Sequence, residues 1–190
     1  MPQQSKIIIL EGIATSGKST VIKYLSQLLD KSNLTFTIVG EGITLMPILN
    51  NTEKKISLDL LKRAINNAIQ EGKDLIIFDR LFFTHIFRTN SEYSEFREIE
   101  EMIQNSALLV FLKIDEEQIP ARIQYARQHR DKAWDDYISK KGSDEEIYEY
   151  YINQQRILEN LLSKTSLKYQ VYNTTNLEFE SIARDLLDCV

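Results

Sequence analysis

Short apolar runs alternate with amphipathic segments along most of the chain. The runs that predict buried strands are residues 6–10, 35–39, 75–78, 107–114 and 168–172. Between them, apolar residues recur at helical spacing, as at Val21, Leu25 and Leu28. Strands that alternate with helices in this way are typical of a parallel sheet with helices on both faces. We therefore predict an α/β fold in three layers, built on five parallel strands.

Some of the predicted helices have ends that the sequence indicates. Residues 17–30 follow the first strand, and a second helix is expected to begin at Ser57, whose hydroxyl suits a helix N-cap. Gly72 suits the left-handed turn that ends that helix, and the segment before it, up to Glu53, is predicted as a polar loop. Further helices are expected in part of 82–96, around the arginines of 122–130, at 144–163 and at 178–188.

The first strand leads into a phosphate-binding motif. Residues 12–19 match the pattern G-x-x-x-x-G-K-[ST], between a strand and a helix as that motif requires. Gly12 and Gly17 let the backbone approach phosphates, and N–H groups at the helix start face the anion. Lys18 is predicted to reach the β- and γ-phosphates of ATP, and Ser19 to ligate Mg²⁺. The alternative is a glycine turn with a solvated lysine. The predicted nucleotide-binding residues are Gly12, Ile13, Ala14, Thr15, Ser16, Gly17, Lys18, Ser19 and Thr20.

Charged residues follow the second and third strands, and the carboxyl ends of parallel strands meet at one edge of a sheet. Asp79 is predicted to hold the Mg²⁺ shell, with a helix cap as the alternative. Arg80 is predicted to bind an acceptor phosphate or the transferring phosphoryl group, with a surface salt bridge as the alternative. Glu41 is predicted to accept a proton from an acceptor hydroxyl or to help hold the metal, unless it is a loop glutamate facing water.

A charge-rich segment after the fourth strand is predicted to form a lid. Arg122, Arg127 and Arg130 lie on its expected helix, and a polar segment, 131–143, follows. We expect residues from about 122 to 143 to close over the phosphates, with Arg127 and Arg130 as candidates to neutralise developing charge. The alternative is an ordinary solvated helix face.

An aromatic-rich stretch, 82–96, is predicted to supply one or two residues to an acceptor pocket and the rest to the core. His85 within it is expected to be a satisfied or surface histidine rather than a catalyst. The loop 173–176 is expected either to lie near the ATP base or simply to make a turn.

Composition narrows the class of protein. The chain has 190 residues, of which 43% are hydrophobic and 27% charged, as expected of one folded domain over residues 1–190. A net charge of −5 argues against a general binder of nucleic acid or anionic membranes. The single cysteine, Cys189, allows no internal disulfide, and residues 1–6 lack a signal-peptide pattern. A cytoplasmic protein is therefore expected.

The motif and its neighbours resemble a known family. The run from Leu10 to Thr20 and the pair Asp79-Arg80 are similar to those of thymidylate kinases and related deoxynucleoside kinases. The resemblance implies a P-loop NTPase fold with a five-stranded parallel sheet and a helical lid, ATP and Mg²⁺ as the donor complex, and often a homodimer. Ala14 and Gly42 depart from the thymidylate kinase pattern, and Glu41 matches the base of the nucleoside kinases. Both a nucleoside and a nucleoside monophosphate therefore stay open as acceptor.

Three functions follow from these features. The first is a small-molecule kinase that moves the γ-phosphoryl group of ATP to a nucleoside, a nucleotide or a similar hydroxyl compound. The second is a GTP-dependent switch. Such a switch needs the guanine-reading motif Asn-Lys-x-Asp, and this sequence does not contain it. The third is an ATP-binding module without catalysis. The phosphate-binding motif is common to all three.

Overall fold

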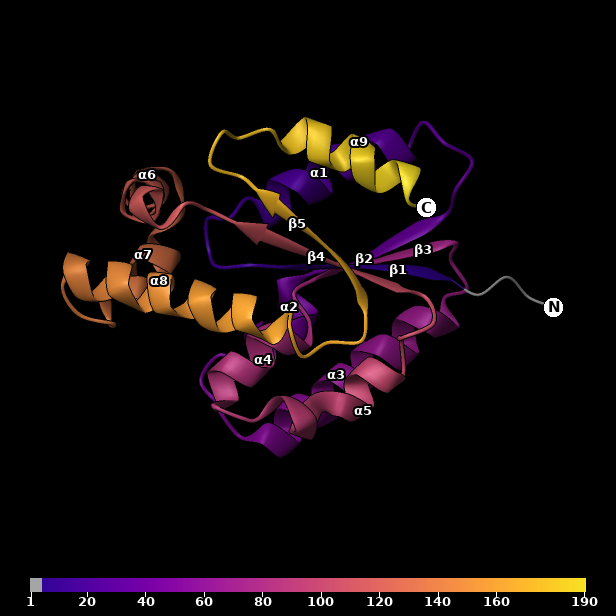
Figure 1. Ribbon diagram of the computed structural model, residues 1–190, viewed down its shortest axis with the longest axis horizontal. Helices are drawn as coiled ribbons and strands as arrows, with labels where there is room; N and C mark the ends of the chain where they lie inside the picture. The colour runs from indigo at the N-terminus through magenta and orange to yellow at the C-terminus, as the bar shows by residue number, and fades with distance from the viewer. Residues whose placement is uncertain (1–4) are drawn as a thin grey trace.

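Five parallel strands form one sheet in the computed structural model, which describes residues 5–190. Residues 1–4, which carry most of the N-terminal segment considered for a signal peptide, lie outside the described residues. The sheet order is β2-β3-β1-β4-β5 (Figure 1), which confirms the predicted parallel sheet. The strands are β1 (Lys6–Glu11), β2 (Phe36–Val39), β3 (Leu75–Asp79), β4 (Ala107–Lys113) and β5 (Lys168–Asn173).

Helices cover both faces of the sheet because its central strands are apolar on both sides. On β1, Ile8 and Leu10 pack toward one layer, and Ile7 and Ile9 pack toward the other. The first layer consists of α1 (Lys18–Leu29) and α9 (Phe179–Asp188). The second consists of α3 (Lys54–Gln70), α4 (Phe82–Thr89), α5 (Arg97–Glu101) and the end of α8 (Asp144–Leu161). Figure 1 shows the two layers on opposite sides of the strands.

The predicted lid region is a small helical unit with its own apolar cluster. It comprises α6 (Ile119–His129), α7 (Lys132–Ser139) and the first turns of α8, which lie together in Figure 1. Buried isoleucines from all three helices form the cluster: Ile119, Ile123, Ile138 and Ile147. Ile13 of the loop after β1 joins the same cluster and is fully buried. The lid therefore packs directly on the loop that it covers.

Two local predictions were wrong. The segment before Glu53 is not a polar loop, because it forms α2 (Glu41–Thr44) and a 3-10 turn (Met46–Ile48) that bury Leu45 and Ile48. Helix α3 begins at Lys54, so Ser57 lies inside its first turn rather than at the N-cap.

The polar segment 131–143 also folds as a helix over much of its length, α7, capped by the Asp131 carboxylate, which accepts a hydrogen bond from the Trp134 N–H. Two 3-10 turns, Tyr93–Phe96 and Glu116–Gln118, precede α5 and α6. Between residues 5 and 190, no helix combines the length and apolar character needed to span a bilayer.

Candidate functional site

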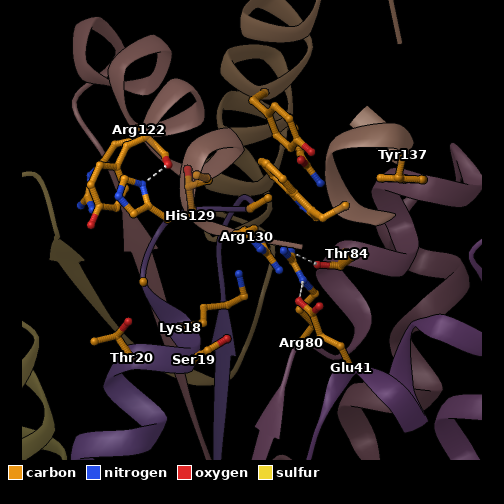
Figure 2. A pocket seen from close by; sticks show the side chains of 18 of the residues that line it. Lys18, Ser19, Thr20, Glu41, Arg80, Thr84, Arg122, His129, Arg130 and Tyr137 are labelled. Atoms are coloured by element: carbon orange, nitrogen blue, oxygen red, sulfur yellow. Dashed lines mark hydrogen bonds and ion pairs between the residues drawn. The ribbon is translucent and has the colours of Figure 1, made fainter. Parts of the chain in front are cut away.

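A cleft of about 970 Å³ opens at the carboxyl ends of the strands. Its floor is the loop that follows β1, and its walls come from the lid on one side and from α2, α4 and α8 on the other. Figure 2 shows Lys18 and Ser19 on the floor, Arg122 and His129 of α6 on one side, and Arg80, Glu41 and Thr84 on the other, with Tyr137 of α7 above them. This is the edge at which parallel α/β sheets bind ligands.

Both glycines of the loop are required by their surroundings. Gly12 has φ 143°, and a Cβ there would lie 2.4 Å from the carbonyl oxygen of Leu112. Gly17 has φ 92°, and a Cβ there would lie 2.1 Å from the ring of Phe179. Both conformations are ones that side chains rarely allow. The loop therefore adopts the tight turn that its sequence pattern predicts.

Backbone N–H groups in the loop are left free at the start of α1. The Ser16 N–H donates to the Ile13 carbonyl and closes the turn. Among the described residues, no partner accepts from the N–H groups of Gly17, Lys18 and Ser19. Unpaired N–H groups at a helix start form a site for anions, strengthened by the helix dipole. This arrangement suits a polyphosphate.

Lys18 is held over this turn by the loop itself. Its Nζ donates to the carbonyl oxygens of Gly12, at 3.1 Å, and Ile13, at 3.0 Å. Burial, together with the nearby Arg80 guanidinium, lowers the pKa of Lys18 to about 8. An anion that replaced the carbonyl contacts would stabilise the charged lysine. Lys18 is therefore poised to bind phosphate.

Asp79 and Ser19 offer oxygen ligands beside Lys18. Asp79 ends β3, and its buried Oδ1 has no hydrogen-bond partner in the described part of the chain. Burial raises the pKa of this carboxyl. Ser19 is exposed to the cleft. Residues 5–190 contain no cluster of three or more His, Cys, Asp or Glu side chains that would hold a metal unaided. The pair fits Mg²⁺ when nucleotide phosphates supply the other oxygens.

Arg80 and Glu41 form an ion pair across the floor of the cleft. Arg80 Nε lies 2.5 Å from a Glu41 carboxylate oxygen, and Arg80 Nη1 donates to the Gly12 carbonyl at 2.7 Å. Arg80 itself is buried and adopts a φ of 66°, a strained backbone conformation for a residue other than glycine. Burial opposes ionisation of Glu41, but Arg80 and Lys18 outweigh it and hold the pKa of Glu41 below its ordinary value. Glu41 is thus not a loop glutamate that only faces water.

A fully buried glutamate that sequence reasoning missed supports this pair. Glu11 ends β1, and its carboxylate accepts from the backbone N–H groups of Leu81 and Phe83 and from the Thr84 hydroxyl. Thr84 also accepts from Arg80 Nη1 at 3.3 Å. Glu11 therefore ties the start of α4 to the phosphate loop. The sequence signal that could have identified Glu11 is an acidic residue at the end of an otherwise apolar strand.

The lid arginines have different surroundings. Arg127 donates to Asp135, Asp144 and Ser139 and does not line the cleft. Arg130, just beyond α6, lines the cleft and stacks on Trp134 with its guanidinium carbon 4.6 Å from the ring centroid. In Figure 2 Arg130 lies between the lid and Arg80.

Arg122 is the third lid arginine, and it lies on the side of the cleft next to the loop 173–176. Its guanidinium donates to the Thr174 carbonyl and lies 5.7 Å from the Phe179 ring centroid. The Thr174 hydroxyl in turn donates to the Ser16 carbonyl. The loop 173–176 therefore contacts both the phosphate loop and the lid. Of the three arginines, Arg127 alone stands outside the cleft.

The aromatic stretch mostly belongs to the core, as expected. Phe82, Phe83, Tyr93 and Phe96 are buried. His85 is also buried, and its Nε2 lies 2.7 Å from the Thr44 carbonyl, so the ring is a donor that links α4 to α2. Burial lowers the pKa of His85 to about 4. From this stretch Arg88, together with Thr84, lines the cleft.

Most aromatic residues that line the cleft come from the lid, with Phe179 of α9 as a further one, and they were not predicted. Trp134 and Tyr137 lie on α7, and Tyr150 and Tyr151 lie on α8. Tyr125 of α6 stacks on His129, with ring centroids 4.0 Å apart. Trp134 and Tyr137 lie in the predicted polar segment, and Tyr150 and Tyr151 lie in a predicted helix. Neither pattern indicates a pocket, because the convergence of these side chains depends on how the lid folds.

Comparison with known proteins supports the fold. No protein-family model matches the chain, and no curated protein matches it in sequence. A solved structure of the YorR protein from Bacillus subtilis, in complex with phosphorylated GDP, matches with a TM-score of 0.65 at 18% identity, covering 97% of this chain and 95% of that one.

Two shikimate kinase structures also match, each with a TM-score of 0.61 at 18% identity. One is from Bacteroides thetaiotaomicron and covers 97% of both chains. The other, from Acinetobacter baumannii in complex with shikimate, covers 98% of this chain and 93% of that one. The architecture is therefore the P-loop kinase fold, a five-stranded parallel sheet between helices.

Proposed function

We propose that the protein is an ATP-dependent small-molecule kinase. The observation that carries the proposal is the floor of the cleft, where free backbone N–H groups, Lys18 and Ser19 face the same space as Arg80 and Glu41. A triphosphate needs many donors in a small volume, and an acceptor needs a place beside it. Phosphoryl transfer depends mainly on such positioning and on neutralising charge.

The donor nucleotide is assigned to the phosphate loop and the adjoining side of the lid. The loop N–H groups and Lys18 bind the β- and γ-phosphates, and Ser19 and Asp79 hold Mg²⁺, which neutralises phosphate charge when bound. Arg122 and the loop 173–176 border the space for the base. The YorR protein, whose structure contains phosphorylated GDP, has the same fold.

The acceptor is assigned to the space between Arg80, Glu41 and α4. Its nucleophilic oxygen bonds to the γ-phosphorus while the bond from that phosphorus to the β–γ bridging oxygen breaks. The proton of an acceptor hydroxyl passes to Glu41, and Arg80 and Arg130 neutralise charge on the transferred group. Because Arg80 lowers the pKa of Glu41, this carboxylate is a weak base. That suits a transition state with little need for early proton removal.

We propose a nucleoside or a nucleoside monophosphate as acceptor, as the resemblance to thymidylate and deoxynucleoside kinases implies. A small non-nucleotide hydroxyl compound is the second candidate. It is favoured by the fold shared with two shikimate kinases, one of them solved with shikimate. Both candidates use the same donor site and differ only in what fills the acceptor side.

The test is acceptor-dependent formation of ADP. Nucleosides, nucleoside monophosphates and small hydroxy acids are supplied separately with Mg²⁺ and ATP, and ADP is measured with each. Lys18→Met is expected to lower kcat by roughly 10²–10³-fold, the usual cost of losing a preorganised donor. Lys23→Met, on the exposed side of α1, serves as the matched control. Unchanged turnover in a folded Lys18→Met variant, or ATP binding with no turnover for any acceptor, would contradict the proposal.

A further inference from the structure

A cluster of donors lines the cleft away from the phosphate loop. Arg88 lies on α4 one turn beyond Thr84, Tyr137 lies on α7, and Lys141 follows α7. Arg88 Nη1 donates to the Tyr137 hydroxyl at 3.2 Å. The Lys141 ammonium lies 4.7 Å from the Tyr137 ring centroid and 3.9 Å from that of Tyr150. Two cations and a phenol thus converge on one side of the cleft.

Neither cation has an acidic partner. Among the described residues, no carboxylate lies within salt-bridge distance of Arg88 or Lys141. The two carboxylates that line the cleft are engaged elsewhere, since Glu41 pairs with Arg80 and Asp131 caps α7. The Nε of Arg88 is buried and has no hydrogen-bond partner in the described part of the chain. The Nη2 of Arg88 donates to the Leu49 carbonyl, which is neutral. A half-buried guanidinium charge without an acidic partner is costly unless an anion compensates it.

The pKa of Tyr137 indicates a positive electrostatic field at this side of the cleft. Burial acts to raise the pKa of its phenol, yet that pKa lies below the ordinary value because Arg88 and Lys141 stand beside it. The positive field at the hydroxyl therefore outweighs desolvation. The same field attracts a ligand anion, although the whole chain carries a net charge of −5.

We propose that Arg88, Tyr137 and Lys141 form an anion-binding subsite that holds a phosphate or carboxylate group of the acceptor. The inference rests on the proposed kinase function and specifies its substrate class. Arg80 and Glu41 mark the reacting end, and Arg88 lies beyond Thr84 by one helical turn, about 5–6 Å of rise. The acceptor therefore carries an acidic group at the end remote from the oxygen that is phosphorylated.

This placement separates acceptors by charge. A neutral nucleoside leaves the subsite without a counter-ion, and so does a nucleoside monophosphate that is phosphorylated on its own phosphate. A hydroxy acid, or a phosphate monoester phosphorylated on a separate hydroxyl, fills it, so the subsite favours the second candidate acceptor class. A bidentate contact from a guanidinium favours planar or tetrahedral oxyanions over neutral carbonyl groups. We therefore expect acidic acceptors to have much lower KM values than their uncharged counterparts.

The subsite is tested first by binding. Protein saturated with Mg²⁺ and a non-hydrolysable ATP analogue, which fills the donor site, is titrated by calorimetry with inorganic phosphate and, separately, with acetate. Wild-type protein is expected to bind at least one of them saturably, and which one it binds identifies the source of the anion. Arg88→Met is expected to weaken that binding roughly tenfold, as for the loss of charge-assisted hydrogen bonds.

Two further variants make the result specific. Arg63→Met removes an exposed arginine of α3 outside the cleft and is expected to bind as wild type does. Lys141→Met removes a charge without removing any hydrogen bond to the main chain. Lys141→Met is the variant to test if Arg88→Met destabilises the protein, since that substitution leaves the Leu49 carbonyl without the hydrogen bond from Arg88. Equal anion affinity in wild type, Arg88→Met and Lys141→Met, or no saturable binding of either anion, would overturn the proposal.

Kinetics give a second readout. With an acidic acceptor, Arg88→Met is expected to raise KM roughly tenfold while kcat changes little, because the contact lies away from the reacting atoms. A neutral acceptor that turns over with equal KM in wild type and Arg88→Met, better than any acidic one, would contradict the subsite but leave the kinase proposal standing. Failure of the ATP analogue to bind would instead contradict the kinase proposal itself.

Discussion

The two sides of the cleft present their polar groups in different ways. The side that we propose binds the donor nucleotide, here called the donor side, uses backbone N–H groups and one lysine from residues 12–20, a single stretch that runs from the end of β1 into α1. The side proposed for the acceptor, here called the acceptor side, uses side chains from α2, α4, α7 and α8, which are far apart in the chain. A backbone site is recognisable from glycine spacing alone, because its geometry is local. A side-chain site depends on how separate helices pack.

Two arginines of the lid also show that local sequence does not reveal which side chain faces the cleft. Arg127 and Arg130 lie three residues apart and look alike in sequence. Arg127 is engaged by Asp135 and Asp144 inside the lid, whereas Arg130 lines the cleft against Trp134. Substituting each arginine in turn distinguishes a residue that holds the lid together from one that faces the cleft.

Within this comparison, the largest expected effect comes from substituting Arg130 and Arg127. Arg130→Met is expected to lower kcat by at least roughly 10²-fold, because we propose that Arg130 neutralises charge in the transition state. Arg127→Met is expected to cost only a fraction of that, because it acts through lid packing, and to lower the thermal midpoint instead. Steady-state kinetics and thermal melts of both variants check this. The reverse order of kcat losses would show that the lid rearranges around Arg127 when it closes.

The acceptor side is also held by a buried histidine, which makes its stability sensitive to pH. His85 links α4 to the Thr44 carbonyl, and its pKa is lowered to about 4 in the folded protein. The unfolded chain takes up a proton near its ordinary pKa of about 6.5, and the folded protein does not, so stability is lost as pH falls below that value.

Between pH 7 and pH 5 we expect the free energy of unfolding to fall by about 2 kcal/mol through His85 alone. Denaturant unfolding of wild type and His85→Gln at several pH values measures this difference. The variant retains a donor for the Thr44 carbonyl but has no titrating ring, so its curve is expected to be flatter. Parallel curves for the two proteins would exclude His85 as the cause.

The smallest effect concerns the donor side, where a single lysine titrates. Because the pKa of Lys18 is about 8, the unliganded protein loses this charge as pH rises past that value. The affinity for Mg²⁺ and ATP is therefore expected to fall about eightfold between pH 7.5 and pH 9. Calorimetry at these pH values gives the slope, and Lys18→Met is the control in which it should vanish. A wild-type affinity that stays constant over this range would contradict the role of Lys18.

Much of the fold was predictable because it follows from local patterns. The apolar runs of β1, β3 and β4 and the spacing of α1 and α8 agree with the structure to within a few residues. The failures have different causes. Leu45 and Ile48 are apolar residues in a stretch interpreted as polar, so the local pattern was misread there. Ser57 was placed at a cap because its hydroxyl suits one, but the helix begins three residues earlier, at Lys54.

The site was predictable where a residue's position at the end of a strand determines where it lies in the sheet. Asp79 and Arg80 lie at the carboxyl end of β3, and Glu41 lies just after β2, so a parallel sheet must bring them to one edge. Their ion pair and the buried support from Glu11 could not be predicted, because both depend on side-chain directions across strands.

The amino-acid sequence on its own specified the parallel sheet and the phosphate loop, since strand pattern, glycine spacing and helix start are all local properties. Folding in three dimensions selected Arg130 over Arg127 as the arginine facing the cleft and brought Arg88, Tyr137 and Lys141 together. Those arrangements arise from helix packing, which joins residues that no short segment of the chain contains.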